Sequence, residues 1–344
     1  MVIARKTRMN SLTSPDLLDQ VNPNNKRLQD DFLNYMRSMQ RSEGTIYQYS
    51  HDLDIFWVWN LQNNGNKDFS KISKRDYVAY QNWLVNTNGN SPARVRRLKA
   101  TVSSMSNFVE AILDDEEEFM NFRSAIKKVE SPANVKVREK TVFTDEMLET
   151  LLNVLVERKQ YEKACMLALA MGSGRRKAEL PRFKVSYFDD ENIMYGSLYK
   201  TPEKIKTKGR GTGKYINCYT MSKIFKPYFD LWMKERERLG IKSEWLFPNP
   251  ANTDEHIPVS TLNSWADSFS RMMGMSFYWH AVRHYTTTHL LRLGLPSEVV
   301  QQLFAWDSLE MVRVYDDRET EELFSKYFNE DGVVQVENKS ITDL

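Results

Sequence analysis

The chain has 344 residues, of which 41% are hydrophobic and 27% charged, and its formal net charge is +2 at pH 7. This length suffices for two ordinary domains with full cores, and no apolar run approaches the length of a membrane span, so we expect no membrane partner. A nearly neutral total does not by itself indicate a nucleic-acid binder, so the positions of the charges matter more than their sum.

Cysteine usage and the N-terminal residues indicate a cytoplasmic protein. Cys165 and Cys218 are isolated in apolar or strand-like surroundings, and their spacing suits neither a zinc site nor a disulfide. The first twelve residues lack the apolar core of a secretory signal. We therefore expect two reduced core thiols and no metal.

The N-terminal part of the chain is predicted to be helical. Residues 1–26 are polar and contain Pro15 and Pro23, which suggests a flexible arm. Apolar residues then recur at three- and four-residue steps in four segments, which begin near Leu28, Ser42, Ser73 and Ser91. Residues 27–128 are therefore predicted to form a module of four or five helices.

The helix that begins after Ser91 carries basic residues in its first turns, namely Arg94, Arg96, Arg97 and Lys99. Such a cluster is typical of a solvated helix face. On the evidence of this helix alone, a solvated face is favoured over a binding function. The functional alternative is a set of contacts to the phosphates of a nucleic acid.

Residues 129–141 are predicted to form a linker, because they are polar, lack helical periodicity and contain a Ser–Pro pair. Their lysines and arginines would suit either a tether that passes close to a polyanion or simple solvation. The acidic run from Asp114 to Glu118, just before this linker, is expected to cover a solvated loop or helix end.

The second domain is predicted to span residues 142–330 and to be mainly α-helical with a small antiparallel β-sheet. Two helices follow the N-cap Thr144, and Arg176 and Glu179 then stand three apart at the expected start of another helix. Strands are predicted over residues 183–187, 192–199 and 214–219, with a glycine-rich hairpin loop at residues 207–213. The remaining segments up to Phe277, including residues 245–248, are expected to be helical.

The most informative stretch runs from His280 to Tyr315. Its pattern places His280, Arg283 and His284 on one helical face, and Trp306 and Tyr315 follow after a second apolar helix. Arginine can clamp phosphate oxygens, histidine can exchange a proton near neutral pH, and tyrosine can act as a covalent nucleophile. None of these residues is informative alone, but their combination suggests phosphate chemistry.

Five separated elements now occur in a fixed order: Gly174-Arg-Arg-Lys-Ala-Glu-Leu180, a lysine in a β-hairpin, His280-Ala-Val-Arg283, Trp306, and Tyr315 nine residues later. In this the chain resembles the tyrosine recombinase (phage integrase) family, over roughly residues 28–330 and with the simple two-domain layout of Cre and Xer. The resemblance implies an N-terminal helical core-binding (SAM-like) domain and a C-terminal catalytic domain.

The resemblance also implies a role for each matched residue. Arg176 and Arg283 would hold the oxygens of the scissile phosphate, and Glu179 would orient Arg176. Tyr315 would attack the phosphorus and leave a 3′-phosphotyrosine. Lys208 would protonate the leaving oxygen, with Lys206 as the alternative because the hairpin register is open. His280 would act as the general acid or base on the nucleophile side.

The chain departs from the family pattern at three positions. Trp306 stands where most members have histidine, although Cre and Flp also have tryptophan there. Ala305 replaces the usual glycine, and Arg175 precedes Arg176 where many relatives have an apolar residue. The spacing to Glu179 favours Arg176 as the phosphate-binding arginine.

The resemblance implies double-stranded DNA as the partner. Free monomers would assemble into a homo-tetramer on the DNA, and an accessory or directionality protein could take part. Further DNA contacts are predicted at Lys206, Arg210 and His284, in addition to the four basic residues after Ser91. No cofactor, metal ion or ATP is implied, and a bacterial or phage-encoded protein at the nucleoid is expected. A terminal helix over residues 321–328 would dock on a neighbouring subunit or on its own domain, and residues 331–344 would form a loose tail.

Two other functions remain open at this stage. The chain could keep the recombinase fold and serve as a sequence-specific DNA-binding regulator, such as a phage repressor, with weak or lost chemistry. It could also relax DNA in the manner of a type IB topoisomerase, which shares this chemistry. A competent residue at every position of the site favours the recombinase over the first alternative, and the compact two-domain layout favours it over the second.

Overall fold

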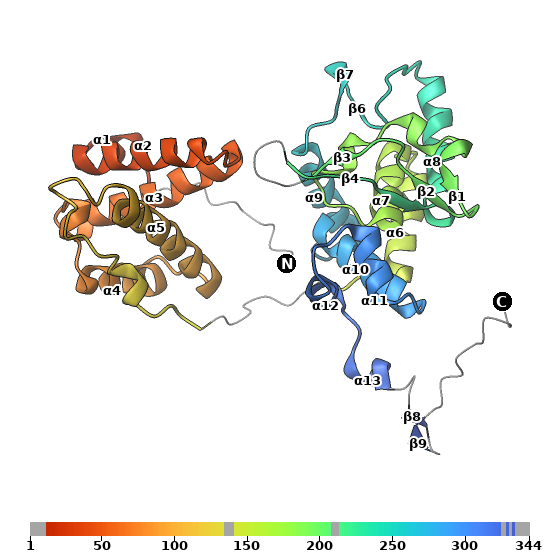
Figure 1. The fold of residues 1–344 in the computed structure, drawn as a ribbon. Helices are drawn as coiled ribbons and strands as arrows, with labels where there is room; N and C mark the ends of the chain where they lie inside the picture. The colour runs from red at the N-terminus through yellow and green to blue at the C-terminus, as the bar shows by residue number, and fades with distance from the viewer. Residues whose placement is uncertain (1–11, 134–140, 208–212, 325–327, 330–331, 334–344) are drawn as a thin grey trace. The chain divides into compact units, whose positions relative to one another are not determined.

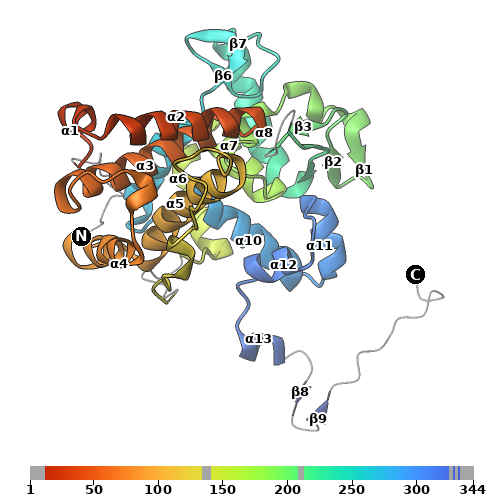
Figure 2. The same ribbon diagram turned by 60° about the vertical axis from the view of Figure 1, so that its left-hand side comes forward.

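A computed structural model describes residues 12–133, 141–207, 213–324, 328–329 and 332–333. The chain forms two compact units, one built from residues 12–133 and the other from residues 141–207 together with the described residues from 214 onward (Figures 1 and 2). Both units are mainly helical and the strands are short and antiparallel, which confirms the predicted fold class.

The N-terminal unit is a bundle of helices joined by short turns. Its α-helices are α1 (Pro15–Asp19), α2 (Pro23–Ser38), α3 (Glu43–Asn63), α4 (Lys74–Asn82) and α5 (Pro92–Ile112). Shorter helical turns are η1 (Phe69–Lys71), the π-helical η2 (Trp83–Thr87) and η3 (Ile126–Lys128). The described residues thus agree with the predicted module of four or five helices.

This unit begins earlier than the sequence predicted. The side chains of Ser14 and Asn22 accept hydrogen bonds from the backbone of α1 and α2, and Pro15 and Pro23 occupy the first turns. Proline is favoured there because the missing N–H would have no helical partner. The two prolines are therefore helix-start signals, and the prediction of a flexible arm is wrong for α1 and for residues 23–26.

Aromatic side chains from α3 fill the core of the N-terminal unit. Phe56, Trp57 and Trp59 are each at most 1% exposed, and the Phe56 ring lies 5.0 Å from the ring of Tyr80 in α4. The indole N–H of Trp57 donates to the side chain of Gln29 in α2. That bond satisfies the buried N–H of Trp57, whereas the buried hydroxyl of Tyr80 has no hydrogen-bond partner among the described residues.

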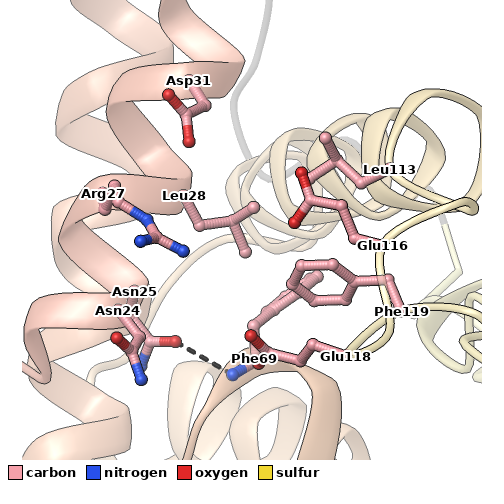
Figure 3. A pocket seen from close by; sticks show the side chains of 10 residues that line it. All are labelled: Asn24, Asn25, Arg27, Leu28, Asp31, Phe69, Leu113, Glu116, Glu118 and Phe119. Carbon is pink, nitrogen blue, oxygen red and sulfur yellow. Dashed lines mark hydrogen bonds between the residues drawn. The ribbon is translucent and has the colours of Figure 1, made fainter.

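A pocket opens between the start of α2 and the turns that follow α5 (Figure 3). Its floor is apolar, with Leu28 and Phe69 among the lining residues, and its other lining residues are Asn24, Asn25, Arg27, Asp31, Leu113, Glu116, Glu118 and Phe119. Carboxylates outnumber the one arginine, so this end of the unit disfavours a polyanion.

The C-terminal unit contains the larger set of elements. Its helices are α6 (Asp145–Glu157), α7 (Tyr161–Ser173), α8 (Ser222–Arg238), α9 (Thr261–Met273), α10 (Trp279–Arg292), α11 (Ser297–Phe304), α12 (Glu310–Tyr315) and α13 (Thr320–Phe324). A three-stranded antiparallel sheet has the order β1 (Ile193–Met194), β2 (Leu198–Lys200), β5 (Tyr219–Met221). Two further hairpins pair β3 (Ile205–Lys206) with β4 (Tyr215–Ile216) and β6 (Pro248–Asn249) with β7 (Asn252–His256).

The strands differ in detail from the prediction. Residues 183–187 were predicted as a strand. They instead follow the 3-10 turn η4 (Leu180–Arg182) and run into the 3-10 turn η5 (Val185–Phe188). A third such turn, η6 (Asp190–Asn192), comes next. The predicted strand 192–199 is a hairpin, because Tyr195 and Gly196 both have positive φ and turn the chain between β1 and β2. The predicted strand 214–219 is divided between β4 and β5, and residues 245–248 lead into a hairpin instead of forming a helix.

Helix α7 is the centre of the C-terminal unit. Every residue from Ala164 to Ser173 is buried, as its apolar sequence predicted, and α6, α8 and α10 pack against it. The helix ends at Gly174, whose φ of 56° is in the left-handed region that favours glycine. A Cβ atom at this position would lie 2.0 Å from Cε1 of Phe304 in α11. The chain therefore needs glycine here for its conformation and for the close approach of α11.

The segment after α12 differs from the predicted terminal helix. Helix α13 ends at Phe324, and Phe328, which we expected on the same helix, lies in β8 (Phe328–Asn329), paired with β9 (Gly332–Val333). The described residues after α13 therefore form two short antiparallel strands. None of the helices in the described ranges is both long and apolar enough to span a membrane.

We expect Gly174→Ala to lower the free energy of unfolding by about 2–5 kcal/mol, because left-handed strain adds to overpacking against Phe304. Gly274 provides the matched control, because it follows α9 with a φ of 65° and a Cβ added there would have no atom within 4 Å. Gly274→Ala should cost only about 1–2 kcal/mol from backbone strain. Urea unfolding of both variants measures the difference, and equal losses would contradict a steric role for Phe304.

Candidate active site

The predicted site residues His280, Arg283, Trp306 and Tyr315 come together in the C-terminal unit. Helices α10, α11 and α12 pack against one another, and Tyr315 is the last residue of α12 (Figure 1). The Tyr315 ring stacks on the Trp306 ring with centroids 4.8 Å apart, and it lies 5.2 Å from the His280 ring. The guanidinium carbon of Arg283 is 5.3 Å from the centre of the Tyr315 ring.

Arg283 is buried at the centre of this group and is only 1% exposed. Its Nη1 donates a hydrogen bond of 2.6 Å to the carbonyl of Gly174. Its guanidinium carbon lies 4.8 and 4.9 Å from the ring centres of Phe304 and Trp306. Nε and Nη2 are also buried, and no hydrogen-bond acceptor for them occurs among the described residues. Buried donors without partners are rare in proteins, and at a functional site a ligand can satisfy them.

The surroundings of Arg283 disfavour its positive charge. Burial, followed by the charges of Arg175 and Arg176, lowers the pKa of Arg283 to about 9. A bound anion would act in the opposite direction, because a nearby negative charge favours the protonated guanidinium. The electrostatics of the site therefore suit an anionic ligand.

Arg176 is half-buried and is held by two side chains. Its Nη1 donates to Oε1 of Glu179 and to Oγ1 of Thr207, at 3.2 Å in each case. Glu179 also accepts hydrogen bonds from the Arg176 backbone N–H and from the Thr207 hydroxyl. The segment is a turn between α7 and η4, so the prediction that Arg176 and Glu179 begin a helix is wrong. Their predicted pairing is nevertheless present.

Glu179 is a charged side chain that is only 2% exposed. Burial alone would raise its pKa, but the hydrogen bond from Thr207, the charges of Arg175 and Arg176 and the backbone N–H of Arg176 together lower it. The carboxylate therefore stays ionised and can fix the Arg176 guanidinium. Thr207 was missed at the sequence level, and the only signal was its place beside two lysines in the hairpin.

Arg175 has a different environment from its neighbour. It is 1% exposed, and its side chain donates to the carbonyls of Ser173 and Leu303 and to Sγ of Cys218. These bonds join the end of α7 to α11 and occupy its guanidinium. Arg176, which keeps part of its surface exposed, is therefore the better placed of the two for a ligand.

Of the two lysines predicted as candidates in the hairpin, Lys206 lies within the described residues. Lys208 lies outside them, as does Arg210. Lys206 is the last residue of β3, where its side chain is exposed and its carbonyl accepts a hydrogen bond from Arg182. On the other arm of the hairpin, Lys214 donates to Asp307 and to the carbonyl of Ala305. The hairpin is thus tied to the turn that carries Trp306, a contact that the sequence did not reveal.

Trp306 follows a residue in an uncommon conformation. Ala305 ends α11 with a φ of 51°, in the left-handed region that favours glycine. Trp306 is 6% exposed, and its indole Nε1 is buried without an acceptor in the described part of the chain. Like Arg283, it has a buried N–H that a ligand could accept.

His284 is buried beside Tyr315. Its side chain is 8% exposed, and its ring packs 4.4 Å from the ring of Tyr315, between centroids. The contact with DNA predicted for His284 stays a prediction. His280, one helical turn earlier, is exposed.

The basic residues of α5 are divided between solvent and the interior. Arg94 and Arg97 form ion pairs of 2.8 and 3.1 Å with the buried carboxylate of Asp52, and Arg96 donates to the carbonyl of Pro132. Lys99 is 4% exposed, and its ammonium donates to Gln81 and to the carbonyls of residues 129 and 130. Lys99 therefore anchors the segment after η3 and is not available to a phosphate in this structure.

In chemical terms, the site combines a phenol, an imidazole and two guanidinium groups, with an indole donor beside them. Such groups can bind an anion and stabilise negative charge that develops during phosphoryl transfer. No group of three or more His, Cys, Asp or Glu side chains that could hold a metal ion occurs among the described residues.

Comparison with protein families gives two matches. Residues 141–322, more than half of the chain, match the phage integrase family, and residues 28–118 match the N-terminal SAM-like domain of phage integrases. The SPbeta prophage-derived recombinase-like protein YomM of Bacillus subtilis (strain 168) is 27% identical over 337 residues, which cover 95% of this chain and 97% of YomM. The tyrosine recombinase XerA of Pyrococcus horikoshii is 21% identical, over 85% of this chain and 89% of that protein.

Solved structures show the same fold. The XerH site-specific recombinase bound to palindromic difH substrate superposes with a TM-score of 0.63 and 15% identity, over 88% of this chain and 94% of XerH. A lambda integrase dimer bound to a COC′ core site gives a TM-score of 0.61 and 18% identity, over 85% of this chain and 77% of that one. The chain therefore belongs to the phage integrase family and is a site-specific tyrosine recombinase.

Proposed function

We propose that this recombinase cleaves and rejoins double-stranded DNA through Tyr315, which forms a 3′-phosphotyrosine with the broken strand. The observation that carries the proposal is the buried guanidinium of Arg283, which lies against the Tyr315 ring with Nε and Nη2 lacking acceptors among the described residues. A phosphate placed beside Tyr315 would supply those acceptors and a negative charge next to the buried guanidinium.

The side chains of the site divide the reaction between them. The phenolic oxygen of Tyr315 attacks the phosphorus while His280 accepts its proton, and the bond from phosphorus to the 5′-oxygen breaks. Lys208, or Lys206 in its place, gives a proton to that leaving oxygen. Arg176, Arg283 and the Trp306 indole N–H bind the non-bridging oxygens, whose charge grows in the transition state. Because one phosphodiester is exchanged for another, a 5′-hydroxyl can reverse the step without ATP.

The N-terminal unit would supply contacts to the DNA backbone. Arg94 and Arg97 are held on one side of α5 by Asp52, and Arg96 is exposed beside them. Helix α5 has 21 residues, a length of roughly 30 Å, so these arginines lie far from the acidic pocket that adjoins its other end. This separation of charge favours phosphate contacts at the N-terminal turns of α5.

Complete recombination would require four protomers that exchange strands through a Holliday junction. Helix α13, which follows the site directly, is the segment that we propose to dock on a neighbouring subunit, with docking on its own unit as the alternative. A chain that bound its DNA site without chemistry would instead act as a regulator, and the first experiment below separates the two functions.

Covalent chemistry can be tested with nicked duplexes that trap the cleaved strand, incubated with protein and resolved on a denaturing gel. We expect the wild-type protein to form an adduct that resists denaturation, and Tyr315→Phe to bind the same DNA without forming one. Tyr285→Phe, which removes a hydroxyl from a tyrosine on the adjacent helix α10, serves as the matched control and should retain the adduct. An adduct that persists in Tyr315→Phe would refute the assignment, and tight binding without an adduct from any protein would identify a regulator.

The proposed contact of α5 predicts a change in salt dependence. Arg96→Gln should weaken DNA binding and reduce the slope of log K against log salt by about 0.9, the value expected for one lost phosphate contact. Arg123→Gln is the control, because Arg123 is an exposed arginine that follows the acidic pocket in sequence. Fluorescence anisotropy across a salt series measures both slopes. If the two variants have the same slope as the wild type, the arginines of α5 form only a solvated face.

A further inference from the structure

A second histidine of α10 contacts the Tyr315 ring and has no part in the chemistry proposed above. The ring centroids of His284 and Tyr315 lie 4.4 Å apart, closer than those of His280 and Tyr315 at 5.2 Å. Whereas His280 is exposed, the side chain of His284 is only 8% exposed. His284 is therefore placed to act on Tyr315 from inside the unit.

The partner of His284 is a carboxylate from the segment that follows the tyrosine. Nδ1 of His284 lies 3.5 Å from Oδ2 of Asp317, whose side chain is 7% exposed. The contact has the distance of an ion pair, but Nδ1 makes no hydrogen bond within the described residues. A carboxylate is costly to bury and is normally kept inside a protein only with a charged or polar partner. Asp317 thus links the position of its own segment to that of His284.

Thr288, one turn further along α10, ties the same segment through the backbone. Its hydroxyl donates to the carbonyl of Tyr315 at 3.3 Å and accepts from the N–H of Asp317 at 3.0 Å. The residues from Tyr315 to Asp317 are therefore held on α10 at three points: the tyrosine ring, the backbone on either side of Asp316, and the Asp317 carboxylate.

We propose that His284 and Asp317 are positioning residues that fix the ring of Tyr315 on α10, so that its hydroxyl meets the phosphate in the geometry needed for attack. In this role, neither side chain forms or breaks a bond in the reaction. Small displacements of a nucleophile are costly in rate, since a misplacement of about 1 Å can cost on the order of 100-fold. The inference rests on the proposed role of Tyr315 as the nucleophile.

The same helix, α10, contributes to a second histidine–aspartate pair, which is not connected to the Tyr315 segment. Nδ1 of His289 lies 3.3 Å from Oδ1 of Asp145, and its ring stacks on Tyr285 with centroids 5.6 Å apart. Asp145 is 63% exposed, so this pair lies at the surface. A substitution of His289 therefore controls for the loss of a histidine–aspartate pair on α10 without a change next to Tyr315.

The test compares the wild type with His284→Leu, His284→Asn, Asp317→Asn, the double variant His284→Leu/Asp317→Asn and the control His289→Leu. We expect His284→Leu and Asp317→Asn to slow single-turnover cleavage at saturating nicked DNA by on the order of 10- to 100-fold. The Kd for DNA and the melting temperature should stay near the wild-type values. His284→Asn should recover part of the rate, because its amide N–H can occupy the place of Nδ1. The double variant should be no slower than the slower single variant, since the two residues act as one unit.

A second readout does not depend on activity. Hydrogen–deuterium exchange of the peptide that contains residues 315–318 should be faster in His284→Leu and Asp317→Asn than in the wild type, and unchanged in His289→Leu. Unchanged cleavage and exchange in both variants would overturn the proposal, as would a loss of rate shared by His289→Leu. If the wild-type protein forms no adduct, the proposed function fails, and the exchange result alone then shows whether the pair holds the Tyr315 segment.

Discussion

The buried guanidinium of Arg283 is the group around which the active-site residues of the C-terminal unit are arranged. Its hydrogen bond to the carbonyl of Gly174 joins α10 to the end of α7, and the rings of Phe304, Trp306 and Tyr315 enclose it from α11 and α12. Gly174 can approach α11 closely only because it has no Cβ. The same contacts that bury the arginine therefore bring the nucleophile, the indole and the Arg176 turn to one place.

This arrangement is costly for the free protein. A charged side chain is removed from water, two of its donor atoms are left without partners among the described residues, and neighbouring arginines oppose its charge. Active sites commonly hold groups in environments that would not be chosen for stability alone. In the proposed complex with DNA, a phosphate would satisfy the donors of Arg283 and Trp306.

Local sequence patterns were sufficient to predict the helical fold class, and the resemblance to the tyrosine recombinase family predicted which residues converge around Tyr315. They were insufficient wherever tertiary contacts decide the environment of a polar side chain. His284 and Lys99 resemble surface residues in sequence, but the first is covered by Tyr315 and Asp317 and the second by the segment after η3. Likewise, Thr207 reaches Glu179 across 28 residues and Arg283 reaches Gly174 across 109, distances at which no local pattern operates.

The most direct test of this account compares two buried arginines with opposite roles, Arg283 and Arg175, each replaced by methionine. Arg283→Met should change the free energy of unfolding by no more than about 1 kcal/mol, because the loss of one hydrogen bond is offset by the removal of a buried charge. Its single-turnover cleavage should fall on the order of 100- to 1,000-fold. Arg175→Met should lose about 2–4 kcal/mol of stability with its hydrogen bonds, yet cleave saturating DNA at a rate much closer to that of the wild type. The reverse pattern, in which Arg283→Met unfolds easily but still cleaves DNA, would contradict the claim that the buried guanidinium is kept for the phosphate.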